Sequence, residues 1–271
     1  MEKKKSSNPL RGFWGLCLVL IASLLFFTAC EQNHDEKATI TKLADLSGKK
    51  VAVLNGTNIP ALLVKEVPGI QCQIYPDNAS ALQALDKDEV SAVAGDALVL
   101  SRAMQGEMEG HFLDESLPQE QYVFAVTKDN LSLAGAIDDT ILSCKDTGIY
   151  MDMVERWLQD SEKSLPDELP TFENATPNGT LRLGVANMAP FAYQDGAGQA
   201  LGFDVELAQR VADVLGKELV VRFYNITDLL PALKAGEIEM ASGCLTVTEA
   251  RSQEFSFSQP YWESSVSLLV K

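Results

Sequence analysis

The chain has few basic residues and almost no histidine. Its 271 residues include 22 Lys and Arg against 38 Asp and Glu, which gives a net charge of −16. Proteins that bind nucleic acid need a basic stripe to neutralise phosphates, so this balance excludes that role. The two histidines, His34 and His111, belong to no cluster with metal-ligand spacing and to no Ser/His/Asp set. The sequence therefore predicts no metal site, no cofactor and no catalytic triad.

The first thirty residues resemble a bacterial lipoprotein signal. Residues 1–11 are basic, residues 12–27 are nearly all apolar, and Phe-Thr-Ala-Cys at 27–30 resembles a lipobox. We expect a signal peptide at 1–29, lipidation of Cys30 and a polar tether at 30–39. The apolar stretch is short for a spanning helix, although a plain membrane anchor is the alternative. Removal of 1–29 takes away four bases and one acid, which leaves a net charge near −19.

Cysteines are few and show no pairing pattern. Cys17 falls in the predicted signal and Cys30 in the lipobox, which leaves Cys72, Cys144 and Cys244. An odd number without CxxC spacing is neither a disulfide framework nor a zinc pattern. Buried free thiols are the favoured interpretation, and one bridge between Cys144 and Cys244 is the alternative.

The last ninety residues alternate between apolar strands and amphipathic helices. The pattern predicts strands at 181–185, 219–223, 238–241 and 265–270. One predicted helix opens at 202–204 and ends before Gly216. Another covers 228–235, with Asn225 or Thr227 as its cap and Gly236 as its left-handed end.

The motifs in this stretch carry a family resemblance. The segments GFDVELA, LLPALKAGEIEMASG, LTVTEAR and FSFSQPY, in that order, resemble the first lobe of the family 3 extracellular solute-binding proteins, the polar amino-acid receptors of ABC transporters. Residues 43–57, LADLSGKKVAVLNGT, resemble the start of the family's second lobe, and 78–96 continue that match. Residues 122–126 resemble the crossover back to the first lobe, and 146–158 resemble the family's closing helix.

The lobes therefore stand in reversed order. We expect a circular permutation that joins the original termini through 161–177, a stretch rich in Pro and acid that is typical of a linker. A truncated tandem receptor is the alternative. The resemblance implies an α/β type II periplasmic-binding-protein fold with two lobes, each a mixed sheet flanked by helices. Lobe 2 would cover 40–126, and lobe 1 would combine final helices at 127–160 with 178–271.

The reversed order also predicts a loose hinge. We expect only the 122–126 connection to cross covalently between the lobes, while 265–270 ends the chain beside it. A freed end loosens a hinge unless that strand stays paired.

The resemblance implies that an amino acid is held between the lobes. Arg251 occupies the position of the family's carboxylate-binding arginine, whose guanidinium can donate two parallel hydrogen bonds. Thr246 occupies a position that contacts the same zwitterion. Asp96 occupies the position of the ammonium-binding acid, at the carboxyl end of a strand. Thr57 and Asn58 precede a probable helix whose free amides could meet the carboxylate.

Each of these residues also has a structural alternative. Arg251 could pair with Glu249 or Glu254 on the surface. Asp96 could cap the helix that follows it, and Thr57 is a common turn residue.

Several positions depart from the family pattern. Four apolar or small residues stand where the family places aromatic or polar contacts: Leu54, Gly95, Met188 and Ile226. One extra residue before Thr246 means that the nearby backbone contact could come from Gly243 or Cys244. An apolar, adaptable pocket predicts a neutral ligand, aliphatic or sulfur-containing. The alternative places Met188 and Ile226 in the core.

The resulting hypothesis is a monomeric, lipid-tethered receptor outside the cytoplasm, in the periplasm or on the outer cell surface. It would deliver an amino acid to an ABC permease in the membrane and would not be an enzyme. A sensor read by a signalling partner is one alternative. A dehydratase-like enzyme on the same fold is another, and it would need a general acid such as Asp96 or Glu249.

Overall fold

The computed structural model describes residues 39–104, 108–159, 164–172 and 177–271. The chain divides into two units, Met1–Thr39 and Ile40–Lys271, and the elements below all belong to the second. The predicted signal peptide, Cys30 and nearly all of the predicted tether lie outside the described residues. Within the described ranges, no helix combines the length and the apolarity that crossing a membrane requires.

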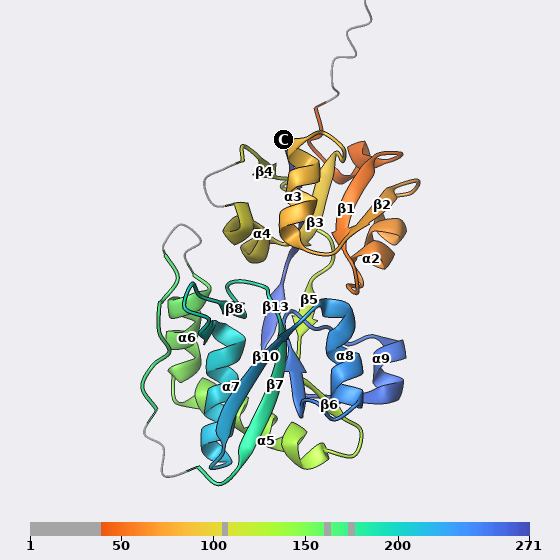
Figure 1. The fold of residues 1–271 in the computed structure, drawn as a ribbon. Coiled ribbons are helices and arrows are strands. Elements are labelled where there is room, and N and C mark those ends of the chain that lie inside the picture. The colour runs from red at the N-terminus through yellow and green to blue at the C-terminus, as the bar shows by residue number, and fades with distance from the viewer. Residues whose placement is uncertain (1–38, 105–107, 160–163, 173–176) are drawn as a thin grey trace, which may run out of the picture. The chain divides into compact units, whose positions relative to one another are not determined.

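Lobe 2 contains a five-stranded sheet in the order β2-β1-β3-β14-β4 (Figure 1). Its strands are β1 (Lys50–Leu54), β2 (Gln71–Tyr75), β3 (Ala92–Asp96), β4 (His111–Phe112) and β14 (Val266–Val270). The first three strands are parallel, and β14 runs antiparallel to both of its neighbours. The helices of this lobe are the short 3-10 helix η1 (Leu43–Leu46), α2 (Ile59–Glu66), α3 (Asn78–Asp86) and α4 (Ala97–Met104).

Lobe 1 contains a second five-stranded sheet in the order β10-β7-β11-β6-β12. Its strands are β6 (Ala125–Thr127), β7 (Thr180–Ala186), β10 (Glu218–Tyr224), β11 (Met240–Ser242) and β12 (Phe255–Phe257). A small hairpin joins β8 (Tyr193–Gln194) to β9 (Ala200–Leu201). The helices are α5 (Leu131–Asp146), α6 (Ile149–Trp157), α7 (Phe203–Val214), α8 (Ile226–Lys234) and α9 (Glu249–Glu254).

The two sheets follow one plan. In lobe 2, β1 lies between β2 and β3, and in lobe 1, β7 lies between β10 and β11. In each sheet the next strand is antiparallel and belongs to a segment that crosses from the other lobe. That strand is β14 in lobe 2 and β6 in lobe 1. The predicted fold class, a two-lobed α/β fold of the type II periplasmic-binding-protein kind, is confirmed.

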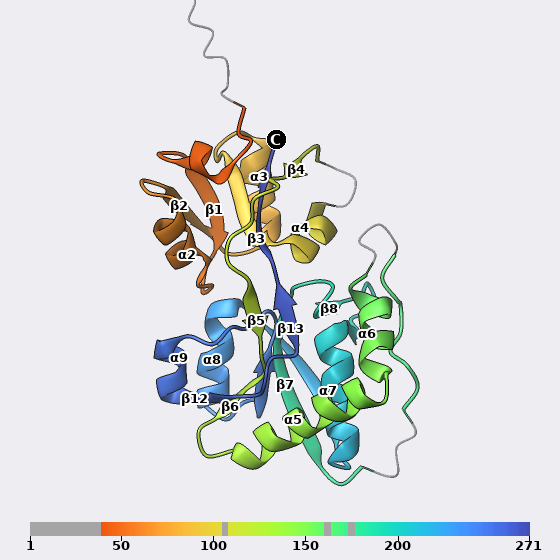
Figure 2. The same ribbon diagram turned by 180° about the vertical axis from the view of Figure 1, so that it is seen from behind.

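Two segments, and not one, cross between the lobes. The strands β5 (Glu120–Tyr122) and β13 (Trp262–Ser264) pair antiparallel in a separate two-stranded ladder, and Figure 2 shows them between the two lobes. The first leads from lobe 2 into β6, and the second leads from lobe 1 into β14. The prediction that only 122–126 crosses is therefore wrong, and so is the placement of residues 265–270 with lobe 1.

Burial explains why the final strand belongs to the interior of a sheet. All five residues of β14 are buried, as expected for a strand that is covered on both faces. Its backbone groups need partners, and they find them in β3 and β4. The strand therefore stays paired. The loose hinge was predicted only for an unpaired final strand, so it is not expected here.

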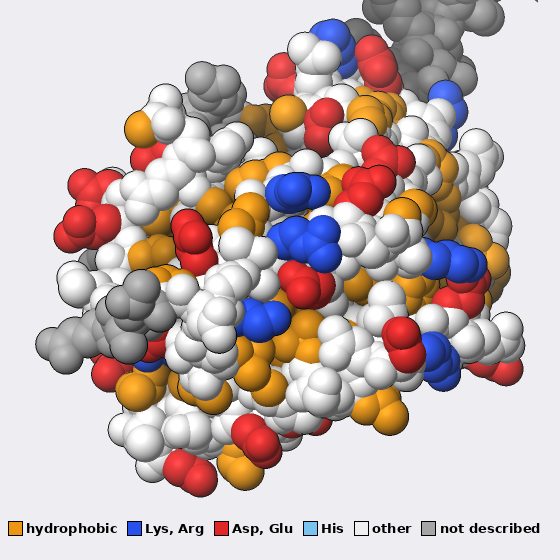
Figure 3. All heavy atoms as spheres, turned by 60° about the horizontal axis from the view of Figure 1, so that its bottom comes forward, with side chains coloured by type: hydrophobic (Ala, Val, Ile, Leu, Met, Phe, Trp, Pro, Cys, Tyr) orange, Lys and Arg blue, Asp and Glu red, His pale blue; other side chains and the backbone are white. Residues whose placement is uncertain are grey.

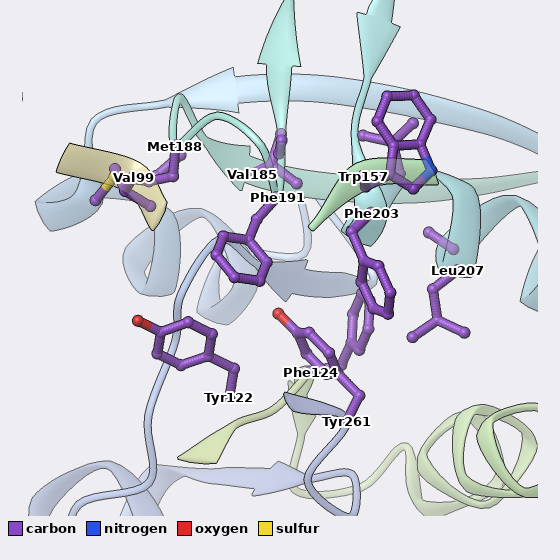
Figure 4. Close-up of a cluster of buried hydrophobic side chains, with 14 of the residues drawn as sticks. Val99, Tyr122, Phe124, Trp157, Val185, Met188, Phe191, Phe203, Leu207 and Tyr261 are labelled. Atoms are coloured by element: carbon purple, nitrogen blue, oxygen red, sulfur yellow. The ribbon is translucent and has the colours of Figure 1, made fainter. Parts of the chain in front are cut away.

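The interior of lobe 1 is built around aromatic side chains (Figure 4). The rings of Phe203 and Tyr261 stack with centroids 5.9 Å apart, and Phe124 packs against Tyr261 at 5.1 Å. Gly202 comes directly before α7 with φ +122, and a Cβ there would lie 2.3 Å from the carbonyl oxygen of Phe191. Only glycine fits this position, which explains the Gly in the Gly-Phe-Asp motif.

The stretch predicted to be a linker lies against lobe 1 where it is described. The Tyr193 hydroxyl donates to the carbonyl oxygen of Pro166 at 2.8 Å, and the ring of Phe172 lies 5.2 Å from the guanidinium of Arg210. The face shown in Figure 3 carries acidic and basic side chains interspersed with apolar ones, without a basic stripe.

Candidate functional site

One cavity is lined by residues of both lobes and by Glu120 and Tyr122 of β5. All eleven residues predicted for the ligand site line it: Leu54, Thr57, Asn58, Gly95, Asp96, Met188, Ile226, Gly243, Cys244, Thr246 and Arg251. They come from five separate stretches of the sequence, 54–58, 95–96, 188, 226 and 243–251, and the fold brings them to one place. Their role in ligand binding stays a prediction.

Arg251 reaches from lobe 1 to lobe 2 across the cavity. It lies in the first turn of α9, whose N-terminus is capped by Thr248: the Thr248 Oγ1 accepts a hydrogen bond from the Arg251 amide at 3.2 Å. Its Nη1 donates to the carbonyl oxygen of Thr246 at 2.8 Å, and its Nη2 donates to the carbonyl oxygen of Gly56 at 2.8 Å. Glu254 instead forms an ion pair with Lys234, so the alternative in which Glu254 pairs with Arg251 is not found.

Asp96 is the buried acid of the cavity and is 7% exposed. Its Oδ1 accepts a hydrogen bond from the Val99 amide at 2.8 Å, so it does cap α4. Its Oδ2 accepts from the Tyr122 hydroxyl at 3.0 Å and from the Ser264 hydroxyl. Burial raises the pKa of Asp96, and these hydrogen bonds oppose the rise. The capping role and a position on the cavity wall thus occur together.

A second carboxylate, Glu120, enters the cavity from β5. It accepts a hydrogen bond from the side chain of Asn58, which stands at the N-terminus of α2. Burial raises the pKa of Glu120, while the hydrogen bond from Asn58 and the charge of Arg251 oppose the rise. Thr57 uses its hydroxyl to bind the carbonyl oxygen of Leu54 at 2.9 Å, which is a turn contact.

A strained loop forms the floor of the site. Both residues of this loop have positive φ angles, +111 at Gly243 and +57 at Cys244. The conformation of Cys244 is unusual, because residues other than glycine rarely adopt it. Asp204 of α7, fully buried, holds this loop: its Oδ2 accepts from the Ser242 hydroxyl at 2.6 Å and from the Gly243 amide at 3.0 Å. Burial raises the pKa of Asp204 to about 6.

The apolar residues of the cavity wall also pack against the interior of the protein. Met188 is buried and packs in the interior cluster, yet it also lines the cavity (Figure 4). Its sulfur accepts a hydrogen bond from the Asn78 side chain of lobe 2 at 3.6 Å. Ile226 approaches Gly56, where an added Cβ would lie 3.0 Å from the Ile226 side chain.

The cysteines described by the structure are free thiols. Cys72, Cys144 and Cys244 form no disulfide, so the bridge between Cys144 and Cys244 is not present. Burial raises the pKa of the Cys244 thiol well above its usual range, and the charges of Asp96 and Asp204 raise it further. Across the described ranges, no group of His, Cys, Asp and Glu has the geometry to hold a metal ion.

Sequence reasoning missed several residues of the cavity wall. They include Asn78, Val99, Glu120, Tyr122, Leu229 and Val266. Tyr122 begins the predicted crossover, 122–126, and Glu120 lies two residues before it on the same strand, β5. A crossover necessarily passes the gap between the lobes. That reasoning could have found both. Asn78 and Leu229 lie at or near helix starts and carry no comparable signal.

Known relatives match the last third of the chain. Residues 181–271 match the family model for bacterial extracellular solute-binding proteins, family 3. An L-cystine-binding protein of Escherichia coli is 32% identical over 112 residues, which is 41% of this chain and 42% of that protein. A glutamine-binding protein of an ABC transporter in Bacillus subtilis is 38% identical over 78 residues, 28% of this chain and 29% of that protein.

The matching segment also occurs in proteins of another kind. A membrane-bound lytic murein transglycosylase F of Pseudoalteromonas translucida is 35% identical over 92 residues, 34% of this chain and 19% of that protein. The chain thus spans less than half the length of each of these relatives. Residues 181–271 are thus similar to family 3 of the bacterial extracellular solute-binding proteins.

Proposed function

We propose that the protein captures an amino acid between its lobes and delivers it to an ABC permease. The proposal rests on one observation: Arg251 and Asp96, side chains of opposite charge from different lobes, line the same cavity. A zwitterion carries the complementary pair of charges. Charge-assisted hydrogen bonds of this kind contribute roughly 1.5–3 kcal/mol each, so a few of them hold a small ligand reversibly.

The ligand we propose is a neutral amino acid with an aliphatic or sulfur-containing side chain. Leu54, Met188 and Ile226 line the cavity, together with Val99 and Leu229. A flexible thioether such as that of Met188 adapts to different side-chain shapes. Glu120 adds negative charge to the same space, which disfavours a ligand with an acidic side chain.

We further propose that the protein works outside the cytoplasm as a monomer tethered by lipid on Cys30. The support is the signal-like sequence of residues 1–30 and the description of the family as extracellular. Labelling of cells with a fatty acid would place lipid on the wild-type chain and none on Cys30→Ser. A Cys30→Ser chain that is still labelled would end this part of the proposal.

We propose that the ligand is bound and released unchanged. The two acids in the cavity, Asp96 and Glu120, already accept hydrogen bonds from side chains of the protein, which suits a fixed charge better than a general acid. Recovery of the ligand after prolonged incubation tests this point, since any converted product would favour an enzyme.

The order of the lobes is proposed to be a circular permutation. Residues 178–271, which resemble the family's first lobe, follow residues 40–160 here, and the described part of 164–172 lies against lobe 1 as a joining segment would. A segment of a tandem receptor remains the alternative, and a rearranged chain, described in the Discussion, separates the two.

Ligand capture is tested directly by a thermal unfolding screen of the full chain against the twenty common L-amino acids and L-cystine. A ligand at 100 times its dissociation constant adds about 2.7 kcal/mol to the free energy of unfolding. We expect a shift with at least one neutral amino acid and no shift for Arg251→Ala. The absence of any shift, or an equal shift in the variant, would overturn the proposal.

A further inference from the structure

Asp96 is held by hydroxyl groups from both segments that cross between the lobes. Tyr122 lies on β5 and Ser264 lies on β13, and both hydroxyls donate to the same oxygen, Oδ2. The other oxygen, Oδ1, accepts from the Val99 amide.

The register of the ladder explains why these two hydroxyls meet. Tyr122 is paired with Trp262, and Ser264 is paired with Glu120. Directly paired residues of an antiparallel ladder share a face, so these four side chains lie on one face, and from it Glu120 and Tyr122 line the cavity. Gln121 and Glu263 occupy the opposite face, where their side chains form a hydrogen bond of 2.9 Å.

We propose that Tyr122 and Ser264 are positioning residues that keep Asp96 ionised for the ligand's ammonium group and connect it to the hinge. This inference rests on the proposed function. Neither residue needs to touch the ligand, because each acts through the carboxylate. Closure of the lobes turns the chain about β5 and β13, the same strands that carry the two donors. The ammonium site and the hinge therefore share one hydrogen-bond network.

The chemistry of a buried acid explains why two donors are needed. Burial favours the neutral form of a carboxyl group, and a neutral Asp96 could not attract an ammonium ion. Hydroxyl donors stabilise the charged form and so oppose the effect of burial. Besides Tyr122, the other ionisable groups that line the cavity are Glu120, Cys244 and Arg251. Glu120 and Cys244 do not stabilise an ionised Asp96, whereas the two hydroxyls stabilise it together with the Val99 amide.

The first measurement needs no ligand. The carboxyl carbon signal of Asp96 is followed by NMR as a function of pH in the full chain and assigned with Asp96→Asn. We expect Tyr122→Phe and Ser264→Ala each to move the titration of Asp96 to higher pH. Ser264→Thr keeps a hydroxyl and should behave like the wild type. Gln121→Ala removes a hydrogen bond from the other face of the same ladder and should leave the titration unchanged.

The second measurement is the dissociation constant for L-glutamine, L-methionine and L-cystine as a function of pH. Protonation of Asp96 weakens binding at low pH, and in the two hydroxyl variants this loss should begin at higher pH, with about tenfold weaker binding there. A weakening by one constant factor at every pH would overturn the inference, because the hydroxyls would then support only the hinge. An unmoved Asp96 titration would overturn it as well.

The two measurements separate the inference from the function on which it rests. If the wild type binds none of the three ligands while the Asp96 titration shifts as expected, amino-acid capture fails and the positioning of the acid stands. If the wild type binds a ligand and neither variant changes its pH dependence, the function stands and the positioning role fails.

Discussion

Arg251 and Gly56 are 195 positions apart in the sequence, yet the Arg251 Nη2 donates a 2.8 Å hydrogen bond to the Gly56 carbonyl oxygen. The same guanidinium donates through Nη1 to the carbonyl oxygen of Thr246. One planar side chain therefore joins a loop of lobe 2 to a loop of lobe 1. A ligand carboxylate that enters the cavity would accept hydrogen bonds from this guanidinium in place of these carbonyl oxygens.

The first prediction concerns the shape of that group. Arg251→Lys keeps the charge but loses the planar fork, so we expect ligand affinity about tenfold to a hundredfold lower, the equivalent of one hydrogen bond to a charged group. Calorimetric titration of the full chain measures the change. Arg222→Lys is the matched control, because Arg222 is exposed and donates to Glu237 away from the cavity. Equal effects of the two substitutions would contradict the assignment of Arg251.

The second prediction concerns the charge of Glu120. Glu120→Gln keeps an oxygen that can accept from Asn58 but removes a negative charge from the cavity. We expect the ratio of affinities for L-glutamate over L-glutamine to rise about tenfold, since like charges no longer face each other. Glu263→Gln, on the outer face of the same ladder, should leave the ratio unchanged. A ratio that stays constant in Glu120→Gln would show that this residue does not affect selectivity.

The third prediction concerns the floor of the site. In Gly243→Ala the new Cβ would lie 2.8 Å from the Ala186 amide nitrogen, at a φ of +111 that side chains rarely adopt. We expect a loss of about 1–3 kcal/mol in the free energy of unfolding, together with weaker ligand binding. In Gly135→Ala the Cβ meets no neighbour within 4 Å on helix α5, so this control should gain about 0.4–1 kcal/mol. Urea denaturation gives both values, and similar losses in both variants would refute the argument.

The fourth prediction is a pH dependence of stability from Asp204. Its pKa in the folded protein is about 6, raised by burial from 3.8, so the folded state binds the proton more tightly than the unfolded state does. The contribution to stability is therefore present below about pH 4 and is lost as the pH rises to 6, by about 3 kcal/mol. Asp204→Asn should remove this slope. The free energy of unfolding across that pH range decides the point, and an unchanged slope in the variant would exclude Asp204 as its source.

The fifth prediction concerns the order of the segments. A rearranged chain with residues 178–271 placed before 40–160 should fold and bind the same ligand within about tenfold of the original affinity, because the contacts are the same and exposed chain ends tolerate permutation. Circular dichroism and calorimetric titration check both properties. A rearranged chain that fails to fold would favour the tandem receptor.

The local sequence was a sound guide to many elements and to the residues that line the cavity. Residues 181–185 and 219–223 alternate or run apolar in the way strands do, and they lie within β7 and β10. The helix predicted over 228–235 begins earlier, at Ile226, and the Asn225 side chain bonds Asp228 instead of capping the backbone. The Asn225 backbone still has the extended conformation of a helix cap.

The placement of the last strand could not be read from local pattern. Val266–Val270 is apolar on both faces, which predicts a buried strand but does not say which sheet receives it. That choice depends on the gap between β3 and β4, which only the assembled lobe presents. Glu120 and Tyr122 were overlooked for a similar reason, because their contacts join residues 62 and 26 positions apart.

The exchange of β6 and β14 means that neither lobe is a contiguous piece of the polypeptide. A fragment that stops before residue 125 lacks β14, so β4 loses the strand that binds it to the rest of its sheet. The complementary fragment lacks β5, the partner of β13, and carries β14 as a surplus strand with exposed edges. Attempts to express one half alone therefore face aggregation, whereas two fragments produced together can complete each other's sheets. The interlocking makes the two lobes dependent on each other for folding as well as for binding.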